Sequence, residues 1–250
     1  MLNRFTRLLP IAVLAVSQPV HAQLKAGDVA IIAFNTDAPD DFAWMPLRDI
    51  PAETTIMFTD SSVSNGCFRW TEHFGPLVGP CGPLVWRSHA SLKAGTVVRW
   101  EGSALTNWSS GEGSGAPPEL STAGDQLFAY TGDITNNPAF PSPWKGDPAG
   151  ATLLFGLNFA NSGWDNVRGG DSSTSFVPPG LSTTACTAVH VNSKEDGYYN
   201  GIRTGTVAQL LAAMACPSNW VTSNAAFSST NWPDSFLILG LHRGTVFSLR

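Results

Sequence analysis

The sequence predicts an all-β protein: a sandwich or barrel of short strands with one short amphipathic helix. Twenty-four glycines and 18 prolines are spread through the 250 residues without a repeat, which suits many turns and argues against a helical bundle. Short apolar and β-branched runs recur between these turns, a spacing typical of sandwiches and barrels. Because 43% of the residues are hydrophobic and 13% are charged, the chain can bury a sizeable core, and this composition excludes a disordered chain.

The first 22 residues are typical of a secretory signal peptide. Arg4 and Arg7 provide a basic start, an apolar run follows, and a small-residue cleavage site ends at Ala22. We expect cleavage there, with residues 23–250 exported to the periplasm or the medium as a single domain. The alternative is an N-terminal membrane anchor, but the apolar run is short and contains Pro10. No later apolar run reaches the roughly 20 residues of a transmembrane segment.

Six runs in the first two thirds of the chain predict strands. Each combines apolar and β-branched residues and is bounded by turn-forming residues. Between the second and third runs, Pro51 interrupts the chain, as a residue without a backbone N–H must. The predicted strands are residues 28–34, 42–47, 54–59, 96–100, 126–130 and 152–157.

The C-terminal third contains the predicted helix. Residues 207–215 place apolar side chains on one face, Thr206 precedes them as an N-cap, and Pro217 prevents continuation. Residues 235–239 and 245–249 are then predicted as a terminal hairpin.

Export makes the four cysteines informative, because thiols in an oxidising compartment usually pair. Of the three connectivities, we favour Cys67–Cys81 and Cys186–Cys216. The first pair closes a short loop rich in glycine and proline, where a disulfide would replace missing core. A zinc site is disfavoured because the sequence contains no Cys-x-x-Cys spacing.

Three segments, residues 27–31, 92–98 and 120–127, resemble the strands and turns of bacterial lamin-tail-type modules. The resemblance covers about residues 24–133 and implies an Ig-like β-sandwich, with residues 134–250 as an elaborated C-terminal part of the domain. Segments near residues 49–60 and 196–201 are similar to uncharacterised modules of exported bacterial proteins. These modules imply no chemistry for particular residues, and the cysteine loop lies outside their pattern.

Charge and motifs exclude several functions. The formal net charge of −5 disfavours binding to the nucleic-acid backbone. The sequence has no Gly-x-Ser-x-Gly elbow, no His-Glu-x-x-His motif, no phosphate-binding loop with its lysine and no dinucleotide fingerprint. The glycine-rich run at residues 111–115 is therefore interpreted as an ordinary loop.

Four oxygen-bearing residues gather in one turn: Asn35, Asp37, Asp40 and Asp41. Calcium requires six to eight oxygen ligands, and flexible acidic loops supply them. The same residue types build turns by bonding to their own backbone, which is the interpretation we favour, and a calcium site is the alternative. A second, weaker candidate with the same alternative is formed by Glu195, Asp196 and Asn200.

Carboxylates near aromatic residues are the candidate catalytic groups. Glu72, Glu112 and Asp165 lie close in sequence to tryptophans on which a sugar could stack, and burial there would raise a carboxyl pKa. His73 and His89 are a candidate base or metal pair, but histidines so spaced are more often surface residues.

Trp70 and Trp108 are the candidate ligand-binding indoles, because their sequence neighbours are polar or glycine. Most of the nine tryptophans are expected to fill the core. We therefore expect an exported, disulfide-stabilised binding or structural module that recognises carbohydrate or a cell-envelope component. The alternative is a secreted carbohydrate-active hydrolase that uses loop carboxylates.

Overall fold

The computed structural model describes residues 23–73, 82–102, 104–160, 162–165, 171–191 and 194–241. Over these residues the protein is all-β, built from two large sheets that are mostly antiparallel, a two-stranded pair and a helix of about two turns. In the described part of the chain, no helix is both long and apolar enough to cross a membrane.

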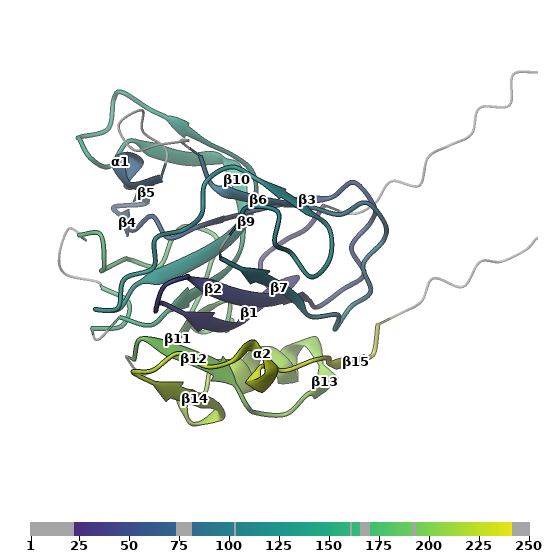
Figure 1. Cartoon of the computed structure of the whole chain (residues 1–250). Helices are drawn as coiled ribbons and strands as arrows, with labels where there is room; N and C mark the ends of the chain where they lie inside the picture. Colours follow the sequence, from purple (N-terminus) through teal and green to yellow (C-terminus); the bar gives the residue numbers. More distant parts are fainter. Residues whose placement is uncertain are drawn as a thin grey trace, which may run out of the picture.

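The first sheet, called sheet A, has five antiparallel strands in the order β14-β12-β1-β2-β7 (Figure 1). Neighbours β1 and β2 follow each other in sequence, whereas β1 and β12 come from opposite ends of the described chain. The strands are β1 (Val29–Asn35), β2 (Asp41–Pro46), β7 (Val98–Glu101), β12 (Asp196–Tyr199) and β14 (Trp220–Ser223).

The second sheet, sheet B, has the order β4-β5-β10-β9-β3-β6-β8, with β11 added in parallel to β10. A short helix, α1 (Trp70–His73), follows β5 at one edge. The strands are β3 (Thr55–Thr59), β4 (Val63–Ser64), β5 (Cys67–Phe68), β6 (Leu84–Arg87), β8 (Glu112–Ser114), β9 (Gln126–Asn136), β10 (Gly146–Asn158) and β11 (Ala188–His190).

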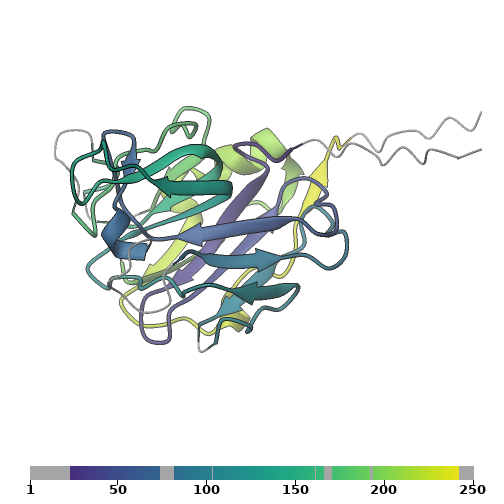
Figure 2. The same cartoon turned by 90° about the horizontal axis from the view of Figure 1, so that it is seen from above.

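Aromatic side chains fill the space between the two sheets. The ring centroid of Phe42 in sheet A lies 4.9 Å from that of Phe58 in sheet B. Likewise, the ring centroid of Trp44 in sheet A lies 4.7 Å from that of Trp86 in sheet B. All four are fully buried. Seen from above, the strands of sheet B lie over those of sheet A (Figure 2). Burial of such large side chains is the main force that holds the sheets together.

The outer face of sheet A is also covered, so every residue of β1 is buried. Residues 224–236 run along this face: Asn35 binds the backbone of Phe227, and Arg99 forms a 2.7 Å ion pair with Asp234. The helix α2 (Val207–Met214) lies beside β12 and β14 (Figure 1), and its Met214 carbonyl accepts a hydrogen bond from the Trp220 indole of β14 at 2.8 Å. Burial on both faces explains why β1 is a continuous apolar run rather than an alternating one.

The predicted helix is confirmed. It is capped as expected: the Thr206 hydroxyl accepts a hydrogen bond from the Gln209 backbone at 3.3 Å, and the Gln209 side chain accepts one from the Thr206 backbone at 2.9 Å. Leu210, Leu211 and Met214 are buried.

Thr206→Ala is expected to lower the free energy of unfolding by about 1 kcal/mol, because it removes this reciprocal cap. Urea denaturation measures the change. Thr206→Ser keeps the hydroxyl and should stay near the wild type; equal losses in both variants would show that the cap does not stabilise the helix.

The six predicted strands are confirmed as β1, β2, β3, β7, β9 and β10, with shifted ends. The largest differences are in β9 and β10, which extend into one long hairpin. The terminal strand β15 (Leu237–Leu239) pairs in parallel with β13 (Thr204–Thr206). Its predicted hairpin partner, residues 245–249, lies outside the described residues.

Three of the four cysteines are described, and each is a free thiol. Cys67 is buried and Cys81, its predicted partner, lies outside the described residues. Cys186 is half-buried at φ 57°, while Cys216 is exposed and bonds the Ser218 hydroxyl at 3.1 Å. Both disulfides stay predictions, which non-reducing peptide mapping would test.

Candidate metal centre

One end of the sandwich gathers acidic side chains, and strand pairing explains why. The end of β1 meets the beginning of β12, since Asn35 lies directly opposite Asp196 in the antiparallel register. The beginnings of β2 and β9 and the ends of β3 and β7 lie at the same end of the sheets. The carboxylates of this acidic end are Asp37, Asp40, Asp41, Asp60, Glu101, Glu119, Asp125, Glu195 and Asp196.

Three of these carboxylates form a compact group. Asp37, Glu195 and Asp196 each offer an oxygen, and the three oxygens lie within 4.8 Å of one another. Oxygens bind calcium at about 2.3–2.6 Å, so two ligands of one ion can be up to about 5 Å apart. The separation of the three oxygens therefore fits ligands arranged around a single hard cation.

Asp196 is the buried member of the group, with no exposed surface. Its Oδ1 accepts a hydrogen bond from the Thr36 backbone N–H at 2.9 Å, whereas its Oδ2 is buried without a hydrogen-bond partner. The hydroxyl of Thr36 is likewise buried without a partner. Burying an unpaired charged oxygen is costly, and a bound cation would remove that cost.

Burial raises the pKa of Asp196 to about 6, against the lowering effect of the backbone N–H groups of Thr36 and Asp37. The charges of Asp37 and Glu195 raise the same pKa further. The group is therefore a concentrated negative charge around one buried carboxyl. A divalent cation would reverse this balance, because it stabilises the ionised form.

The two acidic clusters found in the sequence contribute unequally. Asp37 comes from the first, and Glu195 and Asp196 come from the second. Asn200, the last member of the second, is exposed just beyond the opposite end of β12. Sequence spacing could not join the two halves, because the link between them is the pairing of β1 with β12.

The side chains of the other three residues of this turn, Asn35, Asp40 and Asp41, form hydrogen bonds with backbone groups. The Asn35 amide donates to the Phe227 carbonyl at 3.0 Å. Asp40 accepts from the backbone N–H of Leu120 at 2.7 Å, and Asp41 accepts from that of Gly102 at 2.6 Å. They therefore fix loops around the acidic end and lie outside the three-carboxylate group.

Two candidate catalytic carboxylates lie at opposite edges of sheet B. Glu112 is on β8, exposed, and pairs with Nε2 of His89 at 3.2 Å. Glu72 is in α1, directly after β5, and its side chain and that of His73 lie outside the described part. Five strand spacings of about 4.8 Å separate β5 from β8, roughly 24 Å in all.

Asp165, the third candidate, is half-buried, and its backbone N–H donates to the Ser175 carbonyl. The Ser175 hydroxyl in turn accepts from the backbone of Val63 in β4, so Asp165 is tied to the same edge as α1. Glu112 is therefore too distant to form a catalytic pair with either Glu72 or Asp165.

Trp108 is half-buried and packs against the core, which differs from the expected exposed indole. It forms a β-bridge with Trp100, and its ring centroid lies 5.8 Å from those of Phe42 and Phe58. Trp70 is half-buried in α1, at the other edge of sheet B. The two indoles therefore do not form one binding platform.

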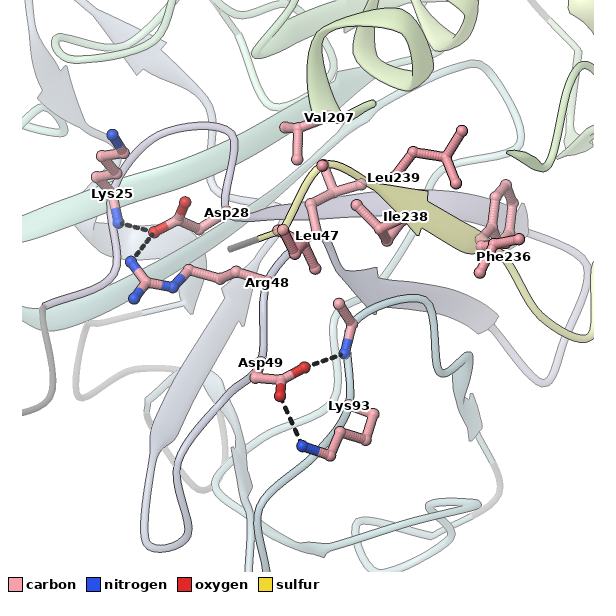
Figure 3. Close-up of a pocket in the computed structure, with 14 residues that line it drawn as sticks. Lys25, Asp28, Leu47, Arg48, Asp49, Lys93, Val207, Phe236, Ile238 and Leu239 are labelled. Atoms are coloured by element: carbon pink, nitrogen blue, oxygen red, sulfur yellow. Dashed lines mark hydrogen bonds and ion pairs between the residues drawn. The ribbon is translucent and has the colours of Figure 1, made fainter. Parts of the chain in front are cut away.

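A cavity of about 930 Å³ lies at the opposite end of sheet A from the acidic group (Figure 3). Leu47, Val207 and Ile238 are among the apolar residues that line it. Four of the charged side chains that line it form ion pairs, Arg48 with Asp28 at 3.3 Å and Lys93 with Asp49 at 2.7 Å, and Lys25 adds a fifth charge. The cavity therefore combines an apolar wall with a rim of three cationic and two anionic side chains.

Asp40 and Asp60 bridge the two sheets through one loop. Asp40 precedes β2 and Asp60 follows β3, and they accept from the adjacent backbone N–H groups of Leu120 and Glu119, each at 2.7 Å. Burial raises the pKa of Asp40 to about 6; the Leu120 N–H lowers it, and the charges of Asp60, Asp41 and Glu119 raise it.

Asp40→Asn is expected to stabilise the protein at pH 7.5 but not at pH 4. A carboxyl whose folded-state pKa exceeds its ordinary value of 3.8 contributes stability that is complete below about pH 4 and lost as pH rises through 6. The gain at pH 7.5 should be about 1–2 kcal/mol, reduced from the full value of two pKa units because Asp40 is partly exposed. Asparagine keeps an oxygen for the Leu120 N–H.

Urea unfolding at the two pH values measures this effect, with the exposed Asp133→Asn of β9 as the matched control. A gain of equal size at both pH values would show that protonation of Asp40 is not its cause.

Comparisons of the chain with protein-family models, with curated proteins and with solved structures find no match.

Proposed function

We propose that this chain is an exported β-sandwich module that binds calcium through Asp37, Glu195 and Asp196 and recognises carbohydrate or a cell-envelope component. The observation that carries the proposal is the fully buried Asp196 carboxylate, which has one unpartnered oxygen beside two further carboxylates. An all-oxygen donor set of this charge suits a hard divalent cation rather than zinc or copper. Backbone carbonyls and water would complete the ligand set.

The cation would join two segments that are distant in sequence. Asp37 lies in the turn between β1 and β2, and Glu195 lies directly before β12. Calcium would therefore hold the β1–β2 turn against β12 and set the shape of the acidic end, where sandwich loops commonly bind ligands. The two facing sheets support the Ig-like, lamin-tail-type architecture that forms part of the proposal.

A carbohydrate-active hydrolase receives less support. Glu112 lies at the opposite edge of sheet B from Glu72 and Asp165, and a glycosidase needs two carboxyl groups about 5–10 Å apart, so Glu112 is excluded from such a pair. A binding module needs no such pair.

Calorimetric titration of the exported protein with calcium chloride, after treatment with a chelator, tests the proposal. We expect one binding event and a rise in the melting temperature, since a ligand at 100 times its Kd stabilises the folded state by about 2.7 kcal/mol. For a chain of this size that corresponds to roughly 5–10 °C. Absence of both binding heat and thermal shift at millimolar calcium would contradict the metal centre.

A further inference from the structure

An aromatic pair lies next to the metal centre on the outer face of sheet A. Asp196 and Tyr198 are two residues apart on β12, so their side chains leave the same face about 7 Å apart. The ring of Phe227 packs edge-on against that of Tyr198, with centroids 4.9 Å apart and planes at 88°. Both rings are half-buried, so part of the pair faces solvent.

The position of Phe227 is fixed by the strand pair that carries the metal ligands. The buried Asn35 amide donates to the Phe227 carbonyl at 3.0 Å and accepts from its N–H at 3.4 Å. Asn35 lies directly opposite Asp196 across β1 and β12. The aromatic pair is therefore held in a defined place relative to Asp196, and this preorganisation lowers the entropic cost of binding.

The metal centre is open on one side. Asp196 is fully buried, whereas Asp37 and Glu195 are half-buried. Calcium takes six to eight oxygens, and one oxygen from each of the three carboxylates would fill three of these positions. The solvent-facing positions of the ion would be filled by exchangeable oxygen ligands.

The negative charge around the metal centre favours a neutral ligand over an anionic one. Asp40, Asp41, Glu101 and Glu119 share this end of the sandwich and repel anions. Two neighbouring hydroxyls of a sugar can replace water on calcium, while the apolar face of the ring stacks on an aromatic side chain. Residues 224–226, directly before Phe227, are exposed, and Asn224 offers an amide for hydrogen bonding.

We propose that Tyr198 and Phe227, together with the solvent-facing side of the calcium ion, form a subsite for a neutral carbohydrate with vicinal hydroxyls. This inference rests on the proposed calcium site and assigns its ligand. It moves the predicted sugar platform from Trp70 and Trp108 to the outer face of sheet A. The subsite needs both parts, because the ring stacks on the aromatic pair and its hydroxyls coordinate the ion.

Retention of the exported protein on mannose-agarose and galactose-agarose tests the subsite. We expect retention on at least one resin in 2 mM calcium and elution by EGTA. Phe227→Ala should reduce retention at least tenfold without changing the heat of calcium binding, whereas Phe227→Tyr, which keeps a ring, should be retained. Phe140→Ala is the matched control, because Phe140 is a half-buried aromatic in the β9–β10 connection, at the other end of sheet B.

The outcomes separate the two proposals. Calcium binding without retention on either resin would overturn the sugar subsite and leave the metal centre standing. Retention that survives EGTA, or that Phe227→Ala leaves unchanged, would also overturn the subsite. Failure to bind calcium would overturn both, and circular dichroism of each variant shows that it is folded.

Discussion

Trp108→Ala is expected to lower the free energy of unfolding by about 3 kcal/mol. The indole packs against Phe42, Phe58 and Trp100 and bridges β7 through its backbone, so truncation leaves a cavity between the two sheets. Large aromatic residues truncated in a core cost about 3–5 kcal/mol, and the low end applies because Trp108 is only half-buried.

Urea denaturation followed by circular dichroism measures this loss. Trp108→Phe keeps most of the apolar contact and should lose less than half as much. The exposed-platform interpretation makes the opposite prediction: Trp108→Ala would leave the urea midpoint unchanged and weaken retention on polysaccharide. Observation of that pattern would return Trp108 to the binding surface.

Asp196→Asn is expected to change stability in opposite directions with and without calcium. In EDTA at pH 7.5 the variant should be more stable by about 2 kcal/mol, because a neutral amide replaces a buried carboxylate whose pKa is raised to about 6. In millimolar calcium it should be less stable than the wild type, because it loses a charged ligand and with it the stabilisation by the ion.

Thermal unfolding in EDTA and in calcium measures both directions. Asp133→Asn removes an exposed carboxylate from β9 and should shift neither curve relative to the wild type. If Asp196→Asn gains the same melting temperature from calcium as the wild type, Asp196 is not a ligand. If it is less stable in EDTA as well, the buried carboxylate has a partner that stabilises it.

The sequence predicted the local elements well because their signals are local. The apolar run of β1 and the cap of Thr206 each depend on a few neighbouring residues, and both are confirmed. The arrangement of strands within a sheet depends on contacts between distant residues, which a single sequence does not reveal. Glu72 and Glu112 are only 40 positions apart in sequence, yet they belong to opposite edges of sheet B.

The candidate site shows the converse case, in which residues far apart in sequence lie close together in the structure. Asp37 and Asp196 are far apart in sequence but meet through the pairing of β1 with β12. Both acidic clusters could be recognised from their composition, but the sequence could not show that they lie next to each other. Trp108 differs from its expected exposure for a related reason: its polar and glycine neighbours indicated exposure, whereas its bridge to Trp100 packs the half-buried indole against the core.

The position of β12 beside β1 has a consequence for folding. Until the last quarter of the chain is available, one edge of β1 has no partner, and its apolar residues would be exposed beside unpaired backbone groups. Such long-range pairing slows folding and favours aggregation of incomplete chains. A chain truncated before β12 should therefore accumulate as insoluble material rather than as a smaller folded domain, and the segment from β12 onward cannot be treated as a dispensable extension.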